Sequence, residues 1–368
     1  MEVRCFGDQH FEEGNLKVIG FEVDTTNFTC PKPLRSVFGA VRRCTDFNAT
    51  NIDGDLVHCH TWYTHFGGIL AKKNYGIPLV ITVHSLEPLR PWKREQLAGG
   101  YDFSLWVEKT ALEMADAVIA VSAETRRDIE RLFNVDPARI HVIHNGIDLN
   151  QYQKVQSAAA LKRYGIGPDK PYVLFIGRIT RQKGFQHLMR AIQFMDRDFQ
   201  IVLCAAAPDT PGMGEEMKSA VVRAQAQRPG IMWINEMVDQ KTACELYSHA
   251  AVFVCPSIYE PFGIINLEAM ACETAVVASA VGGIKEVVVD GETGFLVPLE
   301  QMKESPFEAT NPEEFARDLA ARINQLMKDL QLRERFGKAG RKRAEENFSW
   351  SAIAAKTKDL YKTLKLST

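Results

Sequence analysis

Two glutamates, Glu260 and Glu268, flank the start of a predicted helix, and this arrangement is the strongest sign of chemistry in the sequence. The apolar run 252–255 is typical of a buried parallel strand, and the loop after it carries Glu260. Beyond the loop, apolar residues fill almost every position, which predicts a buried helix with Glu268 inside it. A buried carboxylate is costly unless another group pairs with it. The backbone amides at the start of this helix would belong to Gly263, Ile264 and Ile265.

Free amides at a helix N-terminus bind phosphate. A carboxylate on each side could hold hydroxyl groups, so the site would suit a sugar nucleotide. The alternative is that Glu260 is a solvated loop residue and Glu268 a capped or paired structural acid, and spacing leaves both interpretations open. A second loop, GRITRQKG at 177–184, places Arg178 and Lys183 where they would face the same phosphates. A solvated loop is again the alternative, because most such charges face water.

Strands alternate with helices along the chain, which predicts an α/β protein with parallel sheets. Parallel sheets bind ligands beyond the carboxyl ends of their strands. In the first half of the chain, several polar residues fall at such ends: His58, His60, His84, Ser122 and His144. His58 and His60 alternate on one strand face, but no third ligand follows at a recognisable spacing, so no metal site is predicted.

Local signals add five expectations for elements along the chain. Ser104 is expected to cap a helix that runs to about residue 115, and Ser122 to cap the next helix. The glycines 282–283 would let the backbone approach a ligand or a neighbouring helix. Residues 286–298 suggest a hairpin-like segment. Asn311 is expected to cap a helix whose buried stripe is Phe315, Leu319, Ile323 and Leu326.

Length and composition restrict the class of protein. The chain has 368 residues, 46% of them hydrophobic and 24% charged, which favours two globular domains. A formal net charge of −2 gives no sign of a nucleic-acid partner. No apolar run approaches the roughly 20 residues of a membrane span, and no signal peptide is recognisable, so a cytoplasmic protein is expected. Eight scattered cysteines are expected to be reduced thiols.

The pair Glu260-x7-Glu268, with Pro-Phe-Gly after the first glutamate, resembles the motif of retaining glycosyltransferases of family 4. Their fold is GT-B, in which two Rossmann-like domains face each other across a cleft. The segments HCHTWYTHFGG and TVHSLEPLRPWKREQLAGGY resemble those of the actinobacterial-type glycogen synthases, a subgroup of this family. The resemblance implies an acceptor-side domain at 1–160, a nucleotide-sugar-binding domain at 161–349, and a last helix, 350–368, that packs back on the first domain.

The resemblance also implies residue roles. His84 would line the sugar site, with its backbone carbonyl near the anomeric carbon. Arg178 and Lys183 would hold the leaving diphosphate, Glu260 the donor sugar and Glu268 the ribose. The remaining donor-side residues would be Gly263, Ile264, Ile265 and Ser122. The acceptor-side residues would be His60, Trp62 and Tyr101.

The implied reaction is that of glycogen synthase: glucose moves from ADP-glucose to the 4-hydroxyl of an α-1,4-glucan, with retention and without a metal or further cofactor. The preference for ADP over UDP rests on the resemblance alone. One alternative is a maltose-1-phosphate synthase, in which glucose 1-phosphate is the acceptor and the basic stretch 89–94 holds its phosphate. The other alternative is an inactive glucan-binding form. A dehydrogenase is disfavoured because the dinucleotide fingerprint is absent.

One departure from the family concerns the N-terminus. Members begin with a strand, a glycine-rich loop and a helix ahead of the segment that corresponds to residues 2–7. No such segment is found in the sequence, so the N-terminal domain is expected to lack the first βα unit of the family. That strand would be central in the sheet, which is the reason for considering the inactive form.

Overall fold

The computed structural model describes residues 1–167, 170–304 and 306–365. The chain forms two compact units, Met1–Ile143 with Thr357–Thr368, and His144–Lys356. The expected boundary at residue 160 therefore falls inside the second unit, and the return to the first unit comes at 357 rather than 350. The segment from 144 to 160 belongs to the second unit because it bonds there: the Ile147 amide donates to the Phe348 carbonyl at 2.8 Å.

The second unit contains a six-stranded parallel sheet in the order β10-β9-β8-β11-β12-β13. Its strands are β8 (Tyr172–Arg178), β9 (Gln200–Ala206), β10 (Ile231–Ile234), β11 (Val252–Cys255), β12 (Ala275–Ser279) and β13 (Gly294–Val297). This is the Rossmann order, in which the direction of strand addition reverses between β8 and β11. Ligands of such sheets bind at that switch point, beyond the carboxyl ends of the two strands.

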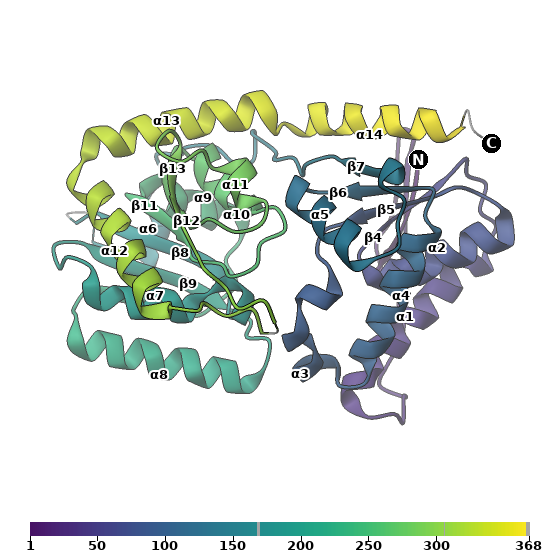
Figure 1. Cartoon of the computed structure of the whole chain (residues 1–368), viewed down its shortest axis with the longest axis horizontal. Coiled ribbons are helices and arrows are strands. Elements are labelled where there is room, and N and C mark those ends of the chain that lie inside the picture. Colours follow the sequence, from purple (N-terminus) through teal and green to yellow (C-terminus); the bar gives the residue numbers. More distant parts are fainter. Residues whose placement is uncertain (168–169, 305, 366–368) are drawn as a thin grey trace. The chain divides into compact units, whose positions relative to one another are not determined.

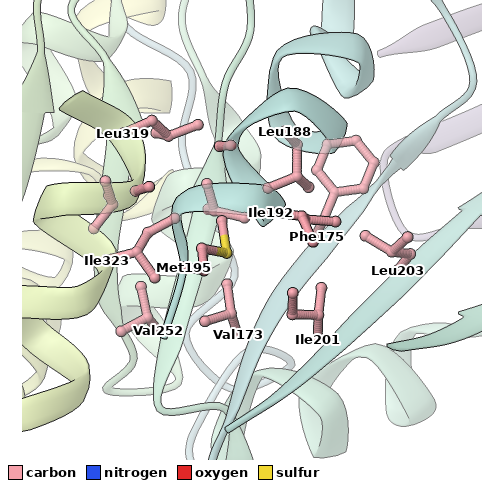
Figure 2. Close-up of a cluster of buried hydrophobic side chains, with 14 of the residues drawn as sticks. Val173, Phe175, Leu188, Ile192, Met195, Ile201, Leu203, Val252, Leu319 and Ile323 are labelled. Carbon is pink, nitrogen blue, oxygen red and sulfur yellow. The ribbon is translucent and has the colours of Figure 1, made fainter. Parts of the chain in front are cut away.

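Helices cover both faces of this sheet (Figure 1). They are α6 (Ala159–Arg163), α7 (Phe185–Ala191), α8 (Pro211–Gln227), α9 (Gln240–His249), α10 (Ile264–Ala271), α11 (Ile284–Val287), α12 (Pro312–Lys328) and α13 (Leu330–Asn347). On one face α7, α8 and α12 pack over the strands, and Figure 2 shows Leu319 and Ile323 of α12 in the same buried cluster as Val173 and Val252 of the sheet. The predicted stripe of α12 is thus confirmed as core, and Asn311 caps the helix as expected.

The first unit contains two sheets. A four-stranded parallel sheet has the order β4-β5-β6-β7, and a three-stranded sheet has the order β1-β3-β2. The strands are β1 (Glu2–Phe6), β2 (His10–Glu13), β3 (Leu16–Phe21), β4 (Val57–His60), β5 (Leu79–Val83), β6 (Ala117–Ala120) and β7 (Ile140–Val142). Within the described residues, β1 pairs only with β3, and β4 only with β5.

Helices accompany both sheets of the first unit. They are α1 (Lys32–Ala49), α2 (Trp62–Tyr75), α3 (Arg94–Leu97), α4 (Gly100–Met114) and α5 (Ala123–Leu132). The last helix, α14 (Trp350–Lys365), contributes its C-terminal part to this unit. No helix in the described part of the chain is long and apolar enough to cross a bilayer.

Two local expectations are wrong. Helix α4 begins at Gly100, so Ser104 lies inside it rather than capping it. The Ser104 hydroxyl is buried and donates to the Glu87 carboxylate at 3.0 Å, which explains a serine at a core position. Residues 286–298 do not form a hairpin: β13 adds to the sheet edge parallel to β12, because its apolar residues are buried there.

Candidate active site

The switch point of the second unit brings Lys183 and Glu260 together. Lys183 ends the loop after β8, and Glu260 lies in the loop after β11, so the two residues come from the two strands at which the order reverses. The Lys183 Nζ lies 2.7 Å from the Glu260 Oε2, and their side chains are only 18% and 10% exposed. The solvated-loop interpretation therefore does not hold for these two side chains.

Lys183 stays charged in this setting. Burial is the largest influence and acts to lower the pKa of Lys183, but the neighbouring acidic groups, Glu260 first, outweigh it and raise the pKa. A desolvated ammonium with a nearby carboxylate acts more strongly on a third charge than an exposed lysine would. Lys183 therefore places a positive charge at the strand ends, where it could attract an anionic ligand group.

The loop that carries Glu260 is fixed from several sides. The Ser257 hydroxyl donates to the Glu260 Oε2 at 3.3 Å, and the Gly283 amide donates to the Glu260 carbonyl at 3.0 Å. Gly282 has φ +51°, and a Cβ built on it would lie 2.0 Å from the Glu260 carbonyl oxygen. The close approach expected of these glycines is therefore to the Glu260 loop itself.

Helix α10 begins next to this loop. Gly263 is its N-cap, with φ +99°, and a Cβ there would lie 3.5 Å from the Glu260 Cγ. The helix is less buried than predicted, since Ile264 is 38% exposed. Ile265 is half-buried, one residue further into the helix. The N-terminal end of α10 and the Lys183–Glu260 pair thus both lie at the edge of the sheet formed by the carboxyl ends of its strands.

Glu268 is a partnered acid. The Tyr247 hydroxyl donates to its Oε2 at 2.9 Å. Burial raises the pKa of Glu268, while hydrogen bonds from Tyr247 and Tyr152 act against this rise. These contacts agree with the alternative interpretation, in which Glu268 is a paired structural acid. They do not test whether Glu268 binds a ribose, so that role stays a prediction. Both tyrosines lie far from Glu268 in the sequence, which is why sequence reasoning missed them.

Arg178 is placed apart from Lys183. Its side chain is 54% exposed and lies 2.5 Å from the Oδ1 of Asp209, which is buried in the loop after β9. Asp209 was not predicted, because a lone aspartate in a loop gives no signal of its own. Of the two predicted phosphate-binding residues, only Lys183 contacts Glu260.

Three histidines line up at the strand ends of the first unit. His60 Nδ1 lies 2.9 Å from His84 Nε2, and the rings of His58 and His60 are 4.4 Å apart. His58 is hydrogen-bonded to the Thr82 hydroxyl at 2.7 Å and to the Tyr361 hydroxyl of α14. Burial is the main cause that lowers the pKa of His58 to about 3 and of His84 to about 4. Neutral imidazoles both donate and accept, as recognition of sugar hydroxyls requires.

The remaining predicted residues of this unit are buried. Trp62 is 4% exposed, and its Nε1 has no hydrogen-bond partner among the described residues. The Tyr101 hydroxyl donates to the Glu87 carbonyl at 2.6 Å. Ser122 caps α5 as expected, and its Oγ accepts from the Thr125 amide at 3.0 Å. The hydroxyls of Tyr101 and Ser122 therefore have structural partners, and their roles in ligand binding stay predictions.

His65 allows the effect of burial on the histidines of the first unit to be tested by the pH dependence of stability. It is 2% exposed, neither of its ring nitrogens has a hydrogen-bond partner among the described residues, and burial lowers its pKa to about 3. Because the folded-state pKa lies below the usual 6.5, the contribution of His65 to stability is complete above pH 6.5 and is lost as pH falls toward 3. Below 6.5 this one group should lower the free energy of unfolding by about 1.4 kcal/mol per pH unit.

The variant His65→Leu should therefore lose stability less steeply than the wild type between pH 6.5 and 4.5. At pH 7 it should be at least as stable, since it no longer buries unpaired polar atoms. Urea unfolding at several pH values measures both quantities. Equal pH slopes in the two proteins would show that His65 is solvated or charged in the folded state.

No group of three or more His, Cys, Asp or Glu side chains in the described ranges is arranged to hold a metal ion. The eight cysteines are free, and six of them are buried. Neither the strand-end histidines nor the thiols therefore form a recognisable metal centre within the described residues.

Comparison with known proteins identifies the family. The model of glycosyltransferase family 4 matches residues 2–151, and that of glycosyl transferases group 1 matches 157–306. An alpha-maltose-1-phosphate synthase of Mycolicibacterium smegmatis is 50% identical over 311 residues, covering 83% of this chain and 78% of that protein. A D-inositol 3-phosphate glycosyltransferase 2 of Catenulispora acidiphila is 31% identical, covering 83% and 70%.

Among solved structures, a sucrose-phosphate synthase from Thermosynechococcus elongatus superposes with a TM-score of 0.78 at 27% identity, covering 97% of this chain and 86% of that one. The prediction of a glycogen synthase is wrong, because relatives at about 50% identity are maltose-1-phosphate synthases. The fold prediction is confirmed: two Rossmann-like α/β domains with parallel sheets. The chain belongs to glycosyltransferase family 4 and is a hexosyltransferase of the GT-B fold.

Proposed function

We propose that the protein is a maltose-1-phosphate synthase, which transfers glucose from a nucleotide sugar to glucose 1-phosphate. The 50% identity to the M. smegmatis maltose-1-phosphate synthase over most of both chains carries this proposal. The other two similar proteins also have a phosphorylated compound in their names. ADP-glucose is the proposed donor, on the basis of the family resemblance.

In the proposed reaction, the bond between the glucosyl anomeric carbon and the diphosphate oxygen breaks. A bond forms between that carbon and the 4-oxygen of the acceptor, with retention, and the hydroxyl proton leaves with the departing phosphate or to water. The transition state carries positive charge on the sugar and negative charge on the diphosphate. Lys183 and the amides at the start of α10 would stabilise the diphosphate, and Glu260 would orient the donor hydroxyls.

The remaining roles follow the same division. Arg178 would reach the diphosphate from its exposed position, at the expense of its contact with Asp209. Glu268 would hold the ribose. In the first unit, His84 would contact the glucosyl group, and His60 would lie with Trp62 and Tyr101 on the acceptor side. The neutral state of His84 allows its ring to accept or donate a hydrogen bond to a sugar hydroxyl.

The test is an assay of ADP release and product with three acceptor conditions: glucose 1-phosphate, glycogen and none. With ADP-glucose and glucose 1-phosphate, we expect stoichiometric ADP and a disaccharide phosphate whose new linkage is α, as seen by mass spectrometry and NMR. A parallel series with UDP-glucose measures the base preference. Transfer to glycogen without any product from glucose 1-phosphate would refute the proposal.

A further inference from the structure

A buried group of charges lies directly after His84. It consists of Glu87, Arg90 and Lys93, whose side chains are 2%, 19% and 7% exposed. Glu87 Oε1 lies 3.4 Å from the Lys93 Nζ and 3.5 Å from the Arg90 Nη1. Two cations therefore share one carboxylate oxygen, and they do so where water has little access.

The other acid near this group, Glu108, forms no ion pair with Arg90 or Lys93 among the described residues. Glu108 is buried, and its Oε2 accepts from the Glu87 amide at 2.8 Å. Burial, together with the charge of Glu87, raises the pKa of Glu108 well above its usual range. Among the described residues, Glu87 is the one carboxylate within ion-pair distance of Arg90 and Lys93. Two largely desolvated cations that share one carboxylate favour a further anion beside them.

Arg90 has unused hydrogen-bonding capacity. Its Nη1 donates to the Ser85 hydroxyl at 3.0 Å, beside His84 in the sequence. Its Nε is buried and has no hydrogen-bond partner within the described part of the chain. A guanidinium binds phosphate through two parallel N–H groups, a geometry that lysine does not offer. Arg94, four residues on, instead forms a two-point contact with Asp102 and is 53% exposed.

We propose that Arg90, supported by Lys93, is the subsite for the phosphate of the acceptor. This inference rests on the proposed function, because it names the part of the same site that recognises a phosphorylated sugar. Within the basic stretch 89–94, the proposal assigns the phosphate to the Arg90 guanidinium, whose Nε has no partner among the described residues, and to the neighbouring Lys93 ammonium. If Arg90 and Lys93 served only to neutralise Glu87, one of these two cations would be sufficient.

The experiment compares glucose 1-phosphate with unphosphorylated glucose as acceptors in the wild type and in Arg90→Gln. Loss of charge-assisted hydrogen bonds should lower the ratio of kcat/KM for glucose 1-phosphate over glucose by roughly 10- to 100-fold, mainly through KM. Arg90→Lys, which keeps the charge but loses the fork, should recover part of the ratio. The matched control is Arg94→Gln, which removes a guanidinium of the same stretch and should leave the ratio unchanged.

A measurement on the wild type alone guards against misfolding of the variants. Inorganic phosphate should inhibit competitively against glucose 1-phosphate and not against the nucleotide sugar. Competition with the nucleotide sugar only, or an unchanged ratio in folded Arg90→Gln, would overturn the subsite while leaving the proposed function intact. A wild type that does not use glucose 1-phosphate at all would instead refute the proposed function.

Discussion

Replacement of Lys183 by alanine should lower kcat by roughly 10²- to 10³-fold, the effect typical of removing one positioned group that stabilises transition-state charge. The reason is the desolvated pair at the switch point: Lys183 Nζ lies 2.7 Å from Glu260. Without Lys183, the Glu260 carboxylate would be left without its partner cation, close to where the diphosphate is proposed to bind. The variant therefore loses an attraction and gains a repulsion, and both act on the departing group.

The measurement is steady-state ADP release at saturating ADP-glucose and glucose 1-phosphate. Arg190→Ala is the control, because Arg190 is an exposed basic residue on α7, just beyond the Lys183 loop. Glu260→Ala and the double variant complete a cycle. If the residues act as a pair, the double variant should be much less impaired than the sum of the single effects predicts. An Lys183→Ala enzyme within threefold of the wild type would refute the role of this lysine.

The sequence could place Lys183 and Glu260 at one edge of the sheet because the signals were local. Each residue stands a fixed number of positions after an apolar strand, and parallel strands place their following loops at one edge of the sheet. The contact between them, 77 residues apart, follows from the strand order. The sequence offered no means of choosing that order by itself, so it left the solvated-loop alternative open.

The misses have a common physical origin. Asp209 and Tyr247 contact the predicted site residues Arg178 and Glu268, and Tyr361 contacts His58 at a strand end. Each of the three contacts joins residues at least 21 positions apart in the sequence. Single residues of these types carry no periodic signal. Ser104 was mistaken for a helix cap because serine suits that position, whereas its hydroxyl instead serves buried Glu87. Tertiary contacts decided these cases, and periodicity does not report them.

The glycogen synthase prediction was wrong for a different reason. Glucan and glucose 1-phosphate present the same 4-hydroxyl, so the residues that carry the chemistry do not distinguish them. The two acceptors would be distinguished by groups that contact the phosphate of glucose 1-phosphate. The sequence of the stretch 89–94 reveals its charged residues but not the residues that pair with them. Arg94 is neutralised by Asp102, while Arg90 and Lys93 share Glu87. Only these contacts distinguish Arg94, which has its own carboxylate, from Arg90 and Lys93, which share one.

Gly282→Ala should lower both the stability of the protein and its activity, because the added methyl displaces the Glu260 loop. A left-handed backbone costs a non-glycine residue about 1–2 kcal/mol, and here the added Cβ would also lie 2.0 Å from the Glu260 carbonyl oxygen. Relief of that clash requires the Glu260 loop to move, at a further cost of about 1–3 kcal/mol. A displacement near 1 Å of a positioning group lowers kcat by about 10²-fold.

Gly291→Ala separates strain from clash. Gly291 has φ +74°, and a Cβ there meets nothing within 4 Å. Both variants therefore acquire the backbone strain, and only Gly282→Ala moves the catalytic loop. Urea unfolding should show a loss of stability in both, larger for Gly282→Ala, while ADP release should fall only in that variant. If Gly282→Ala and Gly291→Ala lost activity equally, backbone strain near β13 would be enough to disturb the site. The contact between Gly282 and the Glu260 carbonyl would then have no special part in placing the carboxylate.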